Sequence, residues 1–163
     1  PAVYADGNGL LERLTGEFPR FADVSDYHGQ PVVLYKLGQL CLWSLHVALS
    51  GTKTFAIRDL DHMTAFADYI LPVALEAMDI LEYTDDLVDR IARKDLIARD
   101  SDQEIEIRAH TIFATALLAD AINAIRPTDR QVVIPQVDFR LWSTYHAAFP
   151  TLRPHHLTRT TMY

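Results

Sequence analysis

Apolar residues recur at helical spacing along most of the chain, and short polar segments that contain Gly or Pro separate these runs. The longest run covers residues 101–125, about six helical turns. Ser101 and Glu104 begin it with the S-x-x-E pattern of a capping box. Other helices are predicted over residues 9–18, 31–51, 63–78, 84–95 and 133–149.

Residue types near the ends of these segments support several helix boundaries. Thr84 is a suitable N-cap for the helix over 84–95, where acids fill the first turn and bases the last. Asp59 or Asp61 is a suitable N-cap for the helix over 63–78. Pro135 falls in the first turn of the last helix, a position that proline tolerates.

Three stretches are less regular. Residues 32–35 read Val-Val-Leu-Tyr and fit either the start of a helix or a short strand. Residues 18–30 are turn-rich and are predicted to be irregular, and the tail over 150–163 to be extended. We therefore predict one mainly α-helical domain spanning residues 1–163, with a small β element near residues 32–35.

Composition narrows the class of protein. Apolar residues make up 49% of the 163 residues, which supports a folded core. The formal net charge of -7 argues against a nucleic-acid polymer as partner, because phosphate contacts need a basic face. A small phosphorylated ligand stays open, since it needs only a few local donors.

Cysteine content and hydropathy indicate the compartment. Cys41 is the only cysteine, which excludes an internal disulfide and a Cys-based zinc site and fits a reducing compartment. No apolar stretch reaches membrane-spanning length without charges, and no secretory signal is evident. We expect a cytoplasmic protein that does not bind membranes.

Asp68 is unusual because it lies in an apolar segment four residues before Pro72. Proline has no N–H to donate to the carbonyl of Asp68, so a kink or helix end is predicted there. Flanking Phe66 and Tyr69 are neighbours that tend to perturb the pKa of a carboxyl group. The simpler interpretation, which the pattern alone favours, places Asp68 on a solvated stripe with Pro72 opening the next helix.

Asp138 and Trp142 are four residues apart and so share one helix face. An acid beside an indole suits a purine-like base, because the ring stacks and the carboxylate accepts two N–H donors. The simpler interpretation is an amphipathic helix with Trp142 in the core, and spacing alone favours it.

Weaker signals lie elsewhere. Asp59, Asp61 and His62 could suggest a metal, but helix capping explains them more simply. His155, His156 and Arg159 fit an anion site, or more simply a solvated terminus. Lys36 fits a phosphate contact, or more simply a surface lysine. No Gly-rich phosphate loop, nucleophile elbow or zinc-binding pair of histidines is present in the sequence.

Six stretches, taken in order, resemble the queuosine salvage family, whose members are queuosine 5′-phosphate N-glycosylases. They read "FPRFADVSDYHGQPVVLYKLGQL", "MTAFADYILP", "LEYTDDLVDRI", "EIEIRAHTI", "VDFRLW" and "HHLTRTTMY". The resemblance runs from about residue 10 to residue 163 and corresponds to the C-terminal half of the family. It implies a helical fold related to helix-hairpin-helix DNA glycosylases. It also implies that an N-terminal half that helps to line the site is missing here.

The resemblance also implies roles for particular residues. The Asp of "FAD", here Asp68, would be the catalytic carboxylate, Phe66 would pack on the base, and Asp138 would hold the deazaguanine edge. No metal or other cofactor is implied. The substrate-binding residues expected on this basis are Phe66, Tyr69, Asp138, Trp142, Ser143, Lys36, His156 and Arg159.

Four positions depart from the family pattern. Leu37, Ile70 and Leu157 stand where basic residues are expected, and Ser143 stands where an acid is expected. If those bases serve the phosphate, a free nucleoside is the better substrate. The loss of the acid at Ser143 would change how the queuine side chain is held.

Three functional hypotheses follow. The first is an N-ribosyl hydrolase that cleaves the N-glycosidic bond of queuosine 5′-phosphate, or of a related deazaguanine nucleoside, and releases queuine for salvage into tRNA modification. The second is a non-catalytic helical module that binds queuine or another nucleobase. The third, a nucleic-acid glycosylase, is disfavoured by the negative charge.

Overall fold

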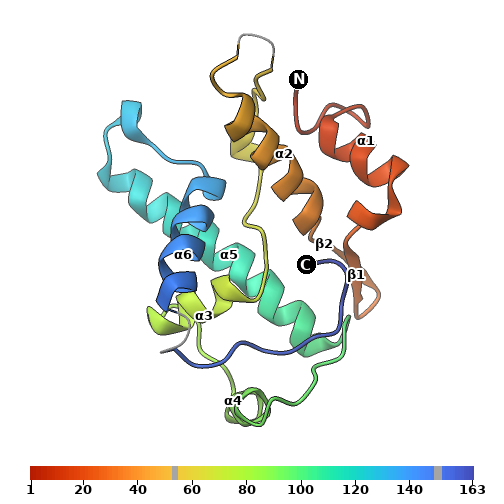
Figure 1. Cartoon of the computed structure of the whole chain (residues 1–163), viewed down its shortest axis with the longest axis vertical. Coiled ribbons are helices and arrows are strands. Elements are labelled where there is room, and N and C mark those ends of the chain that lie inside the picture. Colours follow the sequence, from red (N-terminus) through yellow and green to blue (C-terminus); the bar gives the residue numbers. More distant parts are fainter. Residues whose placement is uncertain (53–54, 149–151) are drawn as a thin grey trace.

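In a computed structural model that describes residues 1–52, 55–148 and 152–163, the chain forms helices and a small antiparallel hairpin that lies at one edge of the molecule (Figure 1). The helices are α1 (Leu10–Glu17), α2 (Lys36–Leu49), α3 (Ile70–Ala77), α4 (Asp85–Ala92), α5 (Asp102–Ile125) and α6 (Ile134–Ala148). The strands are β1 (Val24–Tyr27) and β2 (Gln30–Val33), and short 3-10 turns cover Pro19–Phe21, Leu60–His62 and Thr128–Arg130. The predicted mainly helical class with a small β element is confirmed.

The hairpin corrects two predictions. The stretch over 18–30, expected to be irregular, contains β1, and the segment from Pro31 forms part of β2 before α2 begins at Lys36. His28 and Gly29 make the turn, with φ of 53° and 80°. Positive φ at both positions gives the tight turn that joins two twisted strands, and Gly adopts it without strain. Residues 32–35 thus follow the strand alternative over the helical one, with β2 ending at Val33.

The helix predicted over 63–78 is also shorter than expected. Residues 63–69 are not helical, and α3 begins only at Ile70. Pro72 therefore lies in the first turn of a helix, where its missing N–H removes no intrahelical hydrogen bond. Asp59 and Asp61 do not cap α3, and the Asp59 carboxylate instead accepts hydrogen bonds from the backbone N–H groups of Val3 and Tyr4 at 2.7 and 3.2 Å.

α4, α5 and α6 follow their sequence signals. Thr84 is the N-cap of α4, and Ser101 is the N-cap of α5, where its hydroxyl accepts the Glu104 N–H at 3.4 Å. The Glu104 carboxylate accepts the N–H of Asp100 at 3.2 Å, one residue before the partner that a capping box predicts. α6 begins at Ile134, and Phe149, the last residue of its predicted range, lies outside the described residues.

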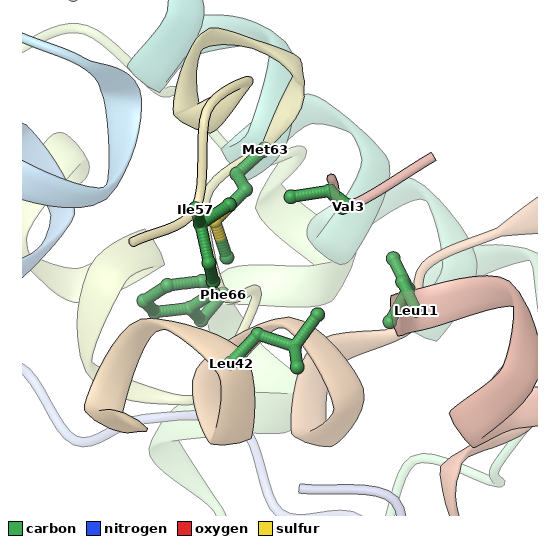
Figure 2. Close-up of a cluster of buried hydrophobic side chains, with 6 residues drawn as sticks. All are labelled: Val3, Leu11, Leu42, Ile57, Met63 and Phe66. Carbon is green, nitrogen blue, oxygen red and sulfur yellow. The ribbon is translucent and has the colours of Figure 1, made fainter. Parts of the chain in front are cut away.

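Buried apolar side chains gather in separate clusters, two of which include residues of α5. α3 packs against α5 and α6, and their cluster includes Leu75, Ala114 and Leu141. A second cluster joins the N-terminal segment, α1, α2 and the 57–66 stretch, and Figure 2 shows its side chains: Val3, Leu11, Leu42, Ile57, Met63 and Phe66. The cluster anchors one end of the 63–69 stretch against α2.

The C-terminal tail returns towards the rest of the fold instead of ending in solvent. In Figure 1 the dark-blue segment runs from the end of α6 across the lower part of the molecule. Leu157 forms a parallel β-bridge with Leu96, and its carbonyl accepts the Ile97 N–H at 2.8 Å. The last residue, Tyr163, lies against Arg108 of α5. None of the described helices is long and apolar enough to cross a membrane.

Candidate functional site

An open cavity of about 850 Å³ lies between α2, α6 and the stretch just before α3. Its lining residues are Lys36, Leu40, Trp43, Ser44, Val47, Ala48, Phe66, Asp68, Tyr69, Asp138, Phe139, Trp142 and Tyr163. Most of this lining is apolar or aromatic, with a few polar groups that converge on it. Such a composition is typical of small-molecule sites, and the volume is large enough for a nucleoside.

Asp68 lies in the cavity wall, where the end of the irregular 63–69 stretch meets α3. Its Oδ1 accepts hydrogen bonds from the N–H groups of Ile70 and Leu71 at 2.8 and 3.1 Å. Asp68 lies one residue before Tyr69, the N-cap of α3, and one of its oxygens accepts the first two N–H groups of the helix. Its Oδ2 accepts no hydrogen bond from the described residues, which leaves that oxygen available to a ligand.

Asp138 connects α6 to the same stretch. Its Oδ2 accepts the Phe66 N–H at 2.6 Å, so this carboxylate holds the chain two residues before Asp68. Asp138 is 4% exposed, and burial raises its pKa to about 7, with a further increase from the charge of Asp68. The Phe66 N–H and the charge of Lys36 act in the opposite direction.

Lys36 is the first residue of α2 and is buried beside the cavity. Burial lowers its pKa, whereas the charges of Asp68 and Asp138 raise it. For the acid Asp68, burial instead raises the pKa, and its two N–H donors and the charge of Lys36 oppose that shift. The three groups thus form a coupled set of two acids and one base in a poorly solvated wall.

Aromatic side chains supply much of the remaining wall. Phe66 is buried, whereas Tyr69 and Trp142 are partly exposed at the cavity. The Tyr69 ring lies 4.6 Å from the ring of His155, and the Trp142 ring stacks on His146 at 4.6 Å. Trp142 and Asp138 share the cavity-facing side of α6, as their spacing predicted.

Three predicted substrate-binding residues are not part of the cavity lining. Ser143 donates its hydroxyl to the Arg140 carbonyl at 3.2 Å, and Arg159 is exposed. His156 is buried, with Nε2 3.2 Å from the hydroxyl of Tyr163, and burial lowers its pKa to about 4. His156 therefore contacts the cavity through Tyr163, and the binding roles of these residues stay predictions.

Sequence reasoning found only Lys36 on one face of the site. Leu40, Trp43, Ser44, Val47 and Ala48 also line the cavity from α2 and were missed. Their spacing of three, four and seven residues is that of one helix face, so the signal was present in the sequence. Phe139 and Tyr163 complete the missed set, and Tyr163 lies in a tail without periodicity that could have indicated its place.

Metal-ligand geometry is not found at this cavity or elsewhere in the described part of the chain. No group of three or more His, Cys, Asp or Glu residues is arranged there to hold a metal ion. Nδ1 of His62 lies 3.6 Å from Oδ2 of Asp59, and the Asp59 carboxylate accepts hydrogen bonds from the N-terminal backbone.

Comparison with known proteins finds one matching family and several similar proteins. The queuosine salvage protein family model matches residues 3–163. A protein of Sphaerobacter thermophilus is 37% identical over 154 residues, which is 94% of this chain and 47% of that protein. A protein of Dictyostelium discoideum is 32% identical over 154 residues, with the same two coverages. A mouse protein is 26% identical over 160 residues, again with 94% and 47% covered.

Each of these relatives is named queuosine 5′-phosphate N-glycosylase/hydrolase. This chain spans about half the length of the curated relatives it matches. The match covers the whole cavity lining, from Lys36 to Tyr163. The chain belongs to the queuosine salvage protein family.

Proposed function

We propose that this chain carries the base pocket and catalytic carboxylate of an N-ribosyl hydrolase. The substrate would be queuosine 5′-phosphate or a related deazaguanine nucleoside, and the product would be queuine for salvage into tRNA modification. One observation carries the proposal: Asp68 and Asp138 converge on a single aromatic cavity and have different hydrogen-bond environments.

These environments suit two roles in glycosidic cleavage. When the C1′–N bond breaks, its electron pair goes to the base and positive charge develops on the ribose. A pKa of about 7 leaves Asp138 partly protonated near neutrality, so it can donate a proton or hydrogen bond to the departing deazaguanine. Asp68, with Oδ2 open, can stabilise the cationic ribose, attack it, or take a proton from the water that adds to C1′.

Lys36 bears on the choice of substrate. It is the only basic side chain among the described residues that line the cavity, and it faces two acids. Phosphate binding usually draws on several cationic or N–H donors. We therefore propose that this half of the site recognises base and ribose, and that a 5′-phosphate gains little affinity from it.

Release of queuine, measured by chromatography, tests the proposal. The protein encoded by the full gene should release queuine from queuosine or its 5′-phosphate, and Asp68→Asn should abolish release while the fold is kept. Asp120→Asn, on the exposed side of α5, is the matched control and should keep wild-type activity. Full activity in Asp68→Asn would overturn the assignment of the catalytic carboxylate.

A non-catalytic queuine-binding module is the second candidate, because the chain covers only about half of each relative. Isothermal titration with queuine distinguishes the two. Tight binding without turnover, even when the N-terminal half of a relative is supplied, would favour the binding module. Turnover would exclude it.

A further inference from the structure

Arg108, on α5, is a buried cation that lies behind the cavity wall. Its side chain is 2% exposed. Nη1 and Nη2 donate to Oδ1 and Oδ2 of Asp23 at 3.0 and 2.5 Å, a two-pronged pairing that only a guanidinium provides. Nε donates to the carbonyl of Ala67 at 3.3 Å. Arg108 does not line the cavity, yet each of these partners is bonded to a residue that does: Asp23 accepts the Lys36 N–H, and Ala67 directly precedes Asp68.

The Ala67 contact acts on Asp68. The carbonyl that Arg108 binds belongs to the peptide unit directly before Asp68, so its orientation helps to set the direction of the Asp68 side chain. The stretch is held on one side by Asp138 at the Phe66 N–H and on the other by the bond of Asp68 to the Ile70 N–H. Arg108 supplies the fixed point between them.

The Asp23 contact acts on Lys36. Oδ2 of Asp23 accepts the Lys36 N–H at 3.3 Å, and the Asp23 carbonyl accepts the N–H groups of Leu34 and Tyr35 at 3.0 and 3.1 Å. Tyr35 has φ of 47°, a strained value for a residue with a side chain. Asp23 thus holds the turn that begins α2, and Arg108 holds Asp23.

The third contact acts on Tyr163. The guanidinium carbon of Arg108 lies 4.5 Å from the centre of the Tyr163 ring, a cation–π arrangement. Tyr163 lines the cavity, and its hydroxyl is 3.2 Å from His156 Nε2. The same guanidinium therefore fixes parts of three cavity walls that are far apart in the sequence.

We infer that Arg108 is a positioning residue that sets the relative places of Asp68, Lys36 and Tyr163. A lysine would keep the charge but has a single nitrogen, so it could not bind both Asp23 oxygens and the Ala67 carbonyl at once. The reaction served by these positions rests on the proposed function, whereas the positioning itself does not.

Backbone hydrogen exchange of the Arg108→Lys chain tests the positioning without any substrate. The Lys36 N–H donates to Asp23, and the Ile70 N–H donates to Asp68. We expect both amides to exchange at least about tenfold faster than in wild type, whereas exchange at Ile91 of α4 stays unchanged. Unchanged exchange at Lys36 and Ile70 would overturn the inference. An equal increase at all three amides would also overturn it, because Arg108 would then only stabilise the fold. If Arg108→Lys does not fold, Asp23→Asn weakens the same pairing and gives the same comparison.

Kinetics of the full protein test the consequence for the site. In Arg108→Lys we expect kcat for queuine release to fall at least about tenfold while KM stays within about threefold, since misplacing catalytic groups mainly affects the transition state. Arg90→Lys is the matched control, because Arg90 also donates to a carbonyl, that of Leu96, away from the cavity. An unchanged kcat in Arg108→Lys would overturn the inference. Absence of release by the wild type would contradict the proposed function, and the exchange comparison would still decide the role of Arg108.

Discussion

Asp68 and Asp138 are the same residue type, and their backbone partners make them chemically different. Burial raises the pKa of Asp68, and the two N–H donors at the start of α3 oppose that rise by favouring its ionised form. Asp138 accepts one, from Phe66, and its pKa is raised to about 7 because it is buried near the charge of Asp68. A fold that separates two carboxyl groups in this way provides an acid and a carboxylate in one cavity.

The raised pKa of Asp138 predicts how stability depends on pH. In the unfolded chain Asp138 loses its proton near pH 4, whereas in the folded protein it keeps the proton up to about pH 7. The free energy of unfolding therefore falls as pH rises over this range and stops falling above about 7. Asp138→Asn removes this slope but keeps an oxygen for the Phe66 N–H. We expect the free energy of unfolding of this variant, relative to that of wild type, to increase by about 2–4 kcal/mol between pH 4 and pH 8.

Urea denaturation at the two pH values measures that gain. Asp120→Asn, at an exposed position on α5, should change the pH slope by less than about 0.5 kcal/mol. Equal pH slopes in wild type and Asp138→Asn would show that Asp138 titrates in the folded protein as it does in the unfolded chain, contrary to the role proposed for it.

At the scale of elements, the start of α3 decides where Asp68 lies. Pro72 occupies the third position of the helix, where no intrahelical N–H bond is lost. We expect Pro72→Ala to change the free energy of unfolding by no more than about 1 kcal/mol. Ala74→Pro, two residues further, should destabilise by about 3 kcal/mol or more, because it removes an intrahelical bond and clashes with the carbonyl of Ile70. Thermal or urea unfolding measures both, and equal losses would mean that the helix begins before Ile70.

Gly29 in the hairpin and Gly16 in α1 allow a similar comparison. Gly29 has φ of 80° in the turn between β1 and β2, so Gly29→Ala should destabilise by about 1 kcal/mol. Gly16 lies within α1 with open space around it, so Gly16→Ala should stabilise by about 0.5–1 kcal/mol. Urea unfolding distinguishes them by sign, and a stabilising Gly29→Ala would contradict the observed turn.

The elements that the sequence predicts correctly are those with a local cause. α4, α5 and α6 begin at Asp85, Asp102 and Ile134, where N-terminal residue types such as Thr84 and Ser101 and apolar periodicity act within the element itself. The stretch before α3 could not be predicted in this way. Its apolar residues pack against α2, and Asp138, 72 residues after Phe66, holds its backbone. Periodicity carries no information about such a distant partner.

At the scale of the whole molecule, the cavity is made by segments that are far apart in the sequence, from α2 to the C-terminal tail. Asp68, Asp138 and Trp142 could be selected from the sequence because acids beside aromatic residues are unusual in apolar runs. Tyr163 could not, since only the return of the tail to α5 places it there. The role of Ser143 rested on resemblance alone, and those of His156 and Arg159 on resemblance and a weak anion-site signal; none of the three lines the cavity.

The α2 wall allows the cavity to be tested apart from the chemistry. Ser44 is exposed and lines the cavity, whereas its neighbour Leu45 is exposed and does not. A tryptophan at 44 would fill the space for the base without disturbing the core, so we expect Ser44→Trp to weaken queuine binding at least about tenfold while stability changes by no more than about 0.5 kcal/mol.

Leu45→Trp adds the same indole on the adjacent face and should leave binding within about twofold of wild type, because it points away from the lining residues. Isothermal titration gives the affinities and urea unfolding the stabilities. If Ser44→Trp binds queuine as tightly as Leu45→Trp, the ligand does not occupy the space beside α2. The base would then contact only α6 and Trp142, and both acids would lie on the same side of it.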